Sequence, residues 1–237
     1  MQLALDLGTP PPARFSNFVR GANSEALTAL RALPEWLAIG DRALGQRMIY
    51  LWGEPGSGRS HLLQACCAET QELGLGARYL GPHSSIAEFD FSPDAALYAV
   101  DDVDQLDAGR QVALFRFYNE VLAQPGHGLV AAGPGAPLSL TQTLREDLRS
   151  RLGWGMVHRV QPLSDEEKIA ALRQAAHDRG LNLSADVPAW LLTHFRRDLP
   201  SLMGLLDALD TYSLEKKRAI TLPLVRDLLK EIGAAGA

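Results

Sequence analysis

Residues 48–62, MIYLWGEPGSGRSHL, constrain the fold of this chain more than any other segment. An apolar run leads into a glycine-rich loop, and residues that favour a helix follow it. The loop matches the phosphate-binding pattern G-x-x-x-x-G-K-[ST] at Gly53, Gly58 and Ser60, with arginine in place of the lysine. Glycines let backbone N–H groups converge on phosphate oxygens, and the positive end of the following helix faces the same anion. The segment therefore predicts a buried strand, a phosphate-binding loop and a helix.

The loop also predicts which residues contact the phosphates. Ser60 carries a hydroxyl suited to a magnesium ion, and Arg59 carries a planar, permanently charged guanidinium. That guanidinium keeps phosphate binding but changes the geometry available for hydrolysis. The alternative is a plain glycine turn between strand and helix, and the flanking apolar and helical patterns favour the phosphate site. The predicted nucleotide contacts in the loop are Gly53, Pro55, Gly56, Ser57, Gly58, Arg59, Ser60 and His61.

A second apolar run, residues 95–100, ends in two carboxylates. Continuous apolarity predicts a strand buried on both faces, and parallel α/β sheets bind ligands at the carboxyl ends of their strands. We expect Asp101 to hold magnesium through water, with the Ser60 hydroxyl on the same ion, and Asp102 to polarise an attacking water. The alternative for either aspartate is a helix cap. For Asp101 the metal role is favoured over the cap. For Asp102 the sequence supports the water-polarising role and the cap equally.

The remaining pattern predicts two units. Strands alternate with helices up to Pro162, and from Ser164, which opens a helix of capping-box form, only helical patterns follow. We expect an α/β domain with a parallel sheet over 15–163 and a small all-helical lid domain over 164–237. The expected helices are 24–37, 60–73, 111–122, 164–179, 186–195, 199–216 and 222–232; the further strands are 77–80, 128–132 and 156–160; 82–93 is a loop or weak turn, and 148–155 a basic turn.

The first residues, QLALDLGTPPP, have the pattern of a tethered peptide. Alternating leucines suit an extended segment, and the triple proline after them is a stiff spacer. Gln2 could bind through its amide while Leu5 and Leu7 fill an apolar pocket on a partner. The alternative is an edge strand or a frayed terminus, which spacing alone favours.

Composition sets wider limits on the chain. A formal charge of −5 over 237 residues provides no broad attraction to DNA. The two cysteines, Cys66 and Cys67, are adjacent and suit a reducing compartment rather than a disulfide. No segment has the pattern of a signal peptide or a membrane span. These features predict a cytoplasmic protein.

Several motifs together resemble one family. FSNFV at 15–19, GEPGSGRSHLL, the strand ending in Asp101 and Asp102, SRLGWG at 150–155 and the helical lid are similar to the AAA+ module of the bacterial replication initiator DnaA. The resemblance covers nearly the whole chain from Phe15. The QLALDL start, the arginine of GSGRSHLL and an end directly after the lid resemble one branch, the regulatory inactivator Hda.

The resemblance implies a function in replication control. It implies docking to the DNA polymerase III β sliding clamp through Gln2, Leu3, Leu5 and Leu7, with DNA contacted mainly through the clamp and no membrane involved. The docked protein would stimulate hydrolysis of DnaA-bound ATP and so inhibit re-initiation. Arg151, of the SRLGWG motif, would act in trans as an arginine finger. The implied ligand is ADP or ATP, and a homodimer is left open.

Three residues depart from the family pattern. Pro134 and Pro200 align by eye where the family has a polar residue after the strand and an arginine in the lid, and Arg59 replaces the loop lysine. We therefore expect weak ATP hydrolysis by the chain alone and ADP held as a structural ligand. The alternatives are a self-sufficient P-loop ATPase and an AAA+ adaptor for another replication-initiation factor.

Overall fold

The computed structural model describes residues 12–40, 44–195 and 198–235. The chain separates into two compact units with the boundary between Pro162 and Leu163. The proposed clamp-docking residues Gln2, Leu3, Leu5 and Leu7 lie outside the described residues, so the structure does not describe that segment.

The first unit is built on one parallel sheet. Its five strands have the order β2-β3-β4-β1-β5, and each neighbouring pair is parallel. The three central strands, β3, β4 and β1, are the apolar runs, because such runs are buried on both faces inside a parallel sheet. Parallel pairing puts all five carboxyl ends at one edge. The strands are β1 (Met48–Trp52), β2 (Gly76–Leu80), β3 (Ala95–Val100), β4 (Gly128–Gly133) and β5 (Met156–Arg159).

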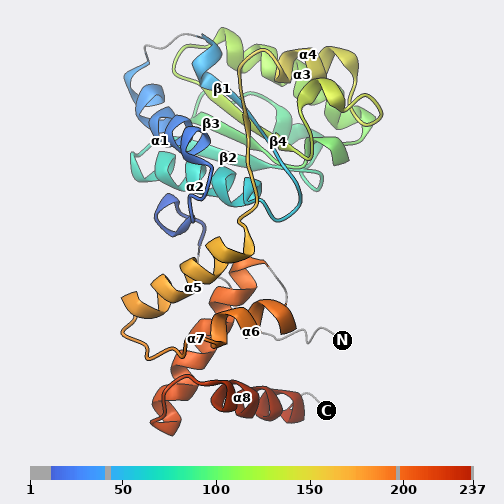
Figure 1. The fold of residues 1–237 in the computed structure, drawn as a ribbon. Helices are drawn as coiled ribbons and strands as arrows, with labels where there is room; N and C mark the ends of the chain where they lie inside the picture. The colour runs from blue at the N-terminus through green and yellow to red at the C-terminus, as the bar shows by residue number, and fades with distance from the viewer. Residues whose placement is uncertain (1–11, 41–43, 196–197, 236–237) are drawn as a thin grey trace. The chain divides into compact units, whose positions relative to one another are not determined.

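Helices cover both faces of this sheet (Figure 1). Strand β1 shows the division, because its successive side chains point to opposite faces. Ile49 and Leu51 pack in the core cluster of α1 and α2, whereas Met48 and Tyr50 pack in that of α3 and α4. Full burial of one such side chain contributes about 1.5–3 kcal/mol to stability. The helices are α1 (Ser24–Ile39), α2 (Arg59–Glu72), α3 (Ala108–Ala123) and α4 (Glu146–Leu152).

The second unit is helical, as predicted. Its core is largely leucine, including Leu172, Leu191, Leu205 and Leu224. The predicted capping box is confirmed: the Ser164 hydroxyl accepts a hydrogen bond from the backbone N–H of Glu167, and the Glu167 carboxylate accepts one from the N–H of Ser164. Over the described ranges, no helix combines the length and apolarity needed to cross a membrane. The helices are α5 (Asp165–Asp178), α6 (Val187–His194), α7 (Leu199–Lys216) and α8 (Leu222–Ala235).

The prediction of a basic turn over 148–155 was wrong in its first half, because helix α4 occupies Glu146–Leu152. Acidic residues fill the first turn of α4 and Arg149 and Arg151 the last, a distribution that suits the helix dipole. Leu148 and Leu152 are four residues apart and both buried, so one face of the helix packs on the core. The basic residues of the segment led to the prediction of a turn, and the spacing of Leu148 and Leu152 was overlooked.

Candidate functional site

The phosphate-binding loop connects β1 to α2, and its backbone requires glycine. Gly56 and Gly58 have φ of +81° and +100°, a region that side-chain-bearing residues rarely adopt. Gly53 donates its N–H to the carbonyl of Gly133 (3.4 Å), and a Cβ at Gly53 would collide with the carbonyl oxygen of Val160. The loop is therefore fixed between the ends of β1, β4 and β5.

An aromatic side chain supports the loop from the N-terminal segment. The ring of Phe18 lies 2.7 Å from the position that a Cβ at Gly58 would occupy, and 5.6 Å from the ring of His61 between centroids. His61 Nε2 lies 2.9 Å from the backbone oxygen of Arg14. The structure thus places His61, a predicted nucleotide contact, against the segment that supports the loop.

Arg59, at the start of α2, projects toward the acidic end of β3. Its side chain is 10% exposed, and Nη2 lies 3.8 Å from Oδ1 of Asp102. Its Nη1 and the hydroxyl of Ser57 are buried and have no hydrogen-bond partner among the described residues. A buried, unsatisfied polar group costs about 1–3 kcal/mol, and more when it is charged. An anion such as a phosphate would supply acceptors for both groups.

The two acids after β3 have different surroundings. Asp101 is 5% exposed; its Oδ2 accepts a hydrogen bond from the Tyr79 hydroxyl (2.5 Å) and its Oδ1 accepts one from the Asp102 N–H (2.9 Å). Asp102 has φ of +45°, and burial together with the Asp101 charge raises the pKa of its carboxyl group. Burial and the bond to Asp101 raise the pKa of the Tyr79 phenol.

The magnesium site at Ser60 and Asp101 stays a prediction. Each oxygen of Asp101 accepts one hydrogen bond inside the protein, so a metal ion or its water would share the carboxylate with Tyr79 and the Asp102 N–H. The sequence missed Tyr79 because it lies 22 positions before Asp101 and belongs to another strand. Only the pairing of β2 with β3 brings them together.

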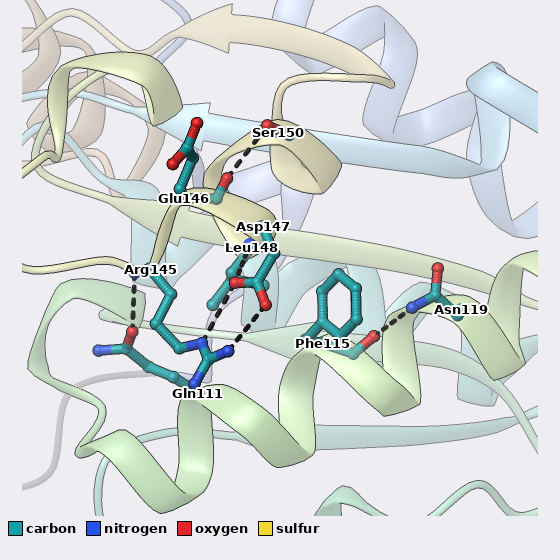
Figure 2. A network of polar contacts seen from close by, with 8 residues as sticks. All are labelled: Gln111, Phe115, Asn119, Arg145, Glu146, Asp147, Leu148 and Ser150. Carbon is teal, nitrogen blue, oxygen red and sulfur yellow. Dashed lines mark hydrogen bonds and ion pairs between the residues drawn. The ribbon is translucent and has the colours of Figure 1, made fainter.

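A buried glutamine fixes the start of α4, on the other face of the sheet (Figure 2). Gln111 is 6% exposed, and its side-chain NH2 donates to the carbonyls of Leu106 and Thr143 (both 2.8 Å). Its side-chain oxygen accepts the N–H of Arg145 (3.1 Å), the residue before α4. The Arg145 guanidinium contacts both carboxylate oxygens of Asp147 and lowers the pKa of that carboxyl group.

The two arginines in the last turn of α4 differ in their contacts. Arg149 donates to the carbonyl of Leu138 (3.3 Å). Arg151 is half-buried and forms no ion pair within the part of the chain that the structure describes. Its charge lowers the otherwise raised pKa of the buried Tyr118 phenol.

Arg151 and the phosphate loop lie at opposite ends of strand β1. After α4 the chain passes Gly155, where a Cβ would collide with the carbonyl of Met48, the first residue of β1. The phosphate loop instead follows Trp52, the last residue of that strand. The length of β1 therefore separates the two, since a strand rises about 3.3 Å per residue. The structure does not bring Arg151 to the loop of its own chain.

One known family matches most of the second unit. Residues 165–229 match the family model described as the lid domain of Hda. This segment is similar to the lid domain of Hda. It comprises α5, α6, α7 and most of α8. The match agrees with the resemblance to Hda found in the sequence motifs.

Solved structures share the fold of most of the chain. Domain III of the Thermotoga maritima replication initiation protein DnaA is 23% identical, with a TM-score of 0.68, covering 95% of this chain and 99% of that one. The replication initiator DnaA bound to AMPPCP and single-stranded DNA is 21% identical (TM-score 0.66; 86% and 67% covered). The RuvB Holliday junction branch migration motor of Thermotoga maritima is 16% identical (TM-score 0.63; 92% and 72% covered). The predicted fold, an AAA+ α/β module with a small all-helical lid domain, is confirmed.

The support of the loop by Phe18 predicts the effect of a single methyl group. Gly58→Ala should weaken ADP binding at least about tenfold, because the new Cβ meets the Phe18 ring at a φ of +100°. Gly74→Ala is the matched control: its φ is +77°, but nothing lies within 4 Å of the added Cβ. Titration calorimetry with ADP compares the two variants, and equal affinities would show that the Phe18 contact does not shape the loop.

Proposed function

We propose that this chain is an accessory AAA+ protein of replication control that stimulates hydrolysis of ATP bound to DnaA while docked on the DNA-loaded sliding clamp. In the cytoplasm this activity would inhibit re-initiation of chromosome replication. The observation that carries the proposal is the Hda-type lid at 165–229 joined to a DnaA-like AAA+ module. The SRLGWG motif and the QLALDL start support the finer parts of it.

The nucleotide held by the chain itself is ADP, used as a structural ligand. The Asp102 carboxylate, which would have to polarise an attacking water, faces the Arg59 guanidinium at 3.8 Å. Pro134 directly follows β4, and Pro200 lies in the first turn of α7. A proline side chain has neither charge nor hydrogen-bonding atoms for a γ-phosphate. We expect turnover of ATP by the chain alone to stay below about 1 per second, the low end of typical enzyme rates.

Arg151 is proposed to act on the nucleotide of DnaA. An arginine that crosses an interface stabilises the charge that develops on the transferred phosphoryl group. The position of Arg151 across the sheet from its own phosphate loop supports a role in trans. Its lack of an ion pair within the described residues leaves the charge available to a partner.

Alanine substitutions in the N-terminal peptide QLALDL, residues 2–7, test the proposal. Gln2→Ala combined with Leu3→Ala should reduce clamp-dependent hydrolysis of DnaA-bound ATP by about 30-fold or more, because central contacts of an interface contribute about 2 kcal/mol or more each. ADP affinity should not change, since the nucleotide residues belong to the unit 13–162. The assay follows labelled ATP on DnaA with clamp loaded on DNA.

Asp6→Ala is the control for the tail. It alters the same six-residue peptide at a side chain that neither the amide nor the leucine contacts require. Loss of stimulation in this variant, or full stimulation by the double variant, would contradict docking through Gln2 and the leucines. Rapid ATP turnover without DnaA would instead favour the self-sufficient ATPase.

A further inference from the structure

The hydroxyl of Tyr79 contacts Asp101, one of the two predicted metal ligands. Tyr79 comes from β2 and donates to Oδ2 of Asp101 at 2.5 Å. Ser60 and Gln64, from the first turns of α2, form weaker hydrogen-bond interactions with the same phenol, which lower its raised pKa. The hydroxyl thus occupies Oδ2 of the first acid after β3, one of the two predicted metal ligands.

Asp101 is held at three points. Its N–H donates to the carbonyl of Leu80 (2.9 Å), its Oδ1 accepts from the N–H of Asp102, and its Oδ2 accepts from Tyr79. Asp101 is 5% exposed and borders a cavity of about 430 Å³, and a cation there would compete with the Tyr79 hydroxyl for Oδ2. In this arrangement the Tyr79 hydroxyl takes the place at Oδ2 of Asp101 that a magnesium ion or its water would use.

The positive charge that a diphosphate needs is already present in the loop. Arg59 is permanently ionised, its side chain is 10% exposed, and its Nη1 is buried with no hydrogen-bond partner among the residues described. A bound phosphate would accept from that nitrogen. Arg59 can thus balance phosphate charge while Tyr79 satisfies the carboxylate that a cation would otherwise neutralise.

We propose that Tyr79 replaces the divalent cation in this phosphate site, so that the chain binds a nucleoside diphosphate independently of magnesium. The inference rests on the proposed nucleotide-binding function and specifies its ligand as the metal-free diphosphate. Tyr79 is a positioning residue: it acts on the nucleotide site through Asp101.

The magnesium dependence of ADP affinity tests this inference. For the wild-type protein, titration calorimetry in excess magnesium and in EDTA should give dissociation constants within about threefold of each other. Tyr79→Phe removes the donor from Asp101, so magnesium should tighten ADP binding by about tenfold or more. The Tyr79 ring is 40% exposed and borders a cavity of about 430 Å³, so loss of its hydroxyl leaves the core intact.

Tyr212→Phe provides the matched control. Its hydroxyl also donates to a carboxylate, that of Glu231 at 2.8 Å, but within the lid. This variant should keep the wild-type response to magnesium.

The possible failures are distinct. A tenfold magnesium effect in the wild-type protein, or no gain of magnesium dependence in Tyr79→Phe, would overturn the inference alone. If the wild-type protein binds ADP in neither buffer, the proposed nucleotide-binding function fails first and the inference fails with it.

Discussion

Arg151→Ala is expected to reduce hydrolysis of DnaA-bound ATP to nearly the rate seen without this chain. Arginines supplied in trans are worth on the order of 10³ to 10⁵ in rate, because they meet charge that develops only in the transition state. Arg151 lies in the last turn of α4 without an ion pair in the described part of the chain, so its removal should leave the fold intact. The measurement follows DnaA-bound ATP with clamp on DNA, and circular dichroism verifies the fold.

Arg149→Ala separates this role from a general loss of positive charge. Arg149 belongs to the same turn of α4, but it donates to the carbonyl of Leu138 in its own unit. We expect Arg149→Ala to keep most of the stimulation. Arg151→Lys should recover only part of it, because an ammonium is a point charge without the bidentate fork of guanidinium. Full stimulation by Arg151→Ala would remove Arg151 from the mechanism.

The phosphate loop could be predicted because all of its determinants are local. The glycines at 53, 56 and 58, the apolar run before them and the helical pattern after them lie within fifteen residues, and the structure places the loop between β1 and α2. The sheet was predictable for a similar reason, since uninterrupted apolar runs such as 95–100 require cover on both faces. The lid helices carried their own start signals, of which Ser164 is the clearest.

The surroundings of Asp101 were not predictable from sequence. Its position at the end of a buried strand suggested a metal ligand, and the structure adds that each of its oxygens accepts a hydrogen bond. One donor, Tyr79, depends on the register that pairs β2 with β3, in which Tyr79 lies opposite Ala99. No periodicity within a single strand encodes that register.

Helix α4 was missed because its stability depends on a distant residue. Seven residues are too few for a helix to persist alone in water, so α4 depends on tertiary contacts. Gln111 in α3 provides two of them, to Thr143 and Arg145 in the segment that leads into α4. A glutamine in the first turn of a predicted amphipathic helix resembles any solvent-facing polar residue, so the sequence gives no sign of this role.

Gln111→Leu should therefore affect both stability and the proposed activity. The substitution keeps the side-chain volume but leaves two buried carbonyls and one N–H without partners, each worth about 1–3 kcal/mol. We expect a loss of about 3 kcal/mol in the free energy of unfolding, which lowers the Tm by roughly 6–12 °C for a protein of this size. Stimulation of DnaA-bound ATP hydrolysis should fall even where the variant is fully folded, because α4 then no longer holds Arg151 in one place.

Asn119→Leu on the same helix tests whether these effects come from α4. The side-chain NH2 of Asn119 donates only to the carbonyl of Phe115, one turn earlier in α3, and Figure 2 shows no link from it to α4. Its replacement should change stability by about 1 kcal/mol or less and leave stimulation unchanged. ADP affinity should stay at the wild-type value in both variants, because the phosphate loop lies against the cluster on the other face of the sheet. A Gln111→Leu variant with wild-type stimulation at a temperature where it is folded would mean that Arg151 is positioned by the partner protein rather than by α4.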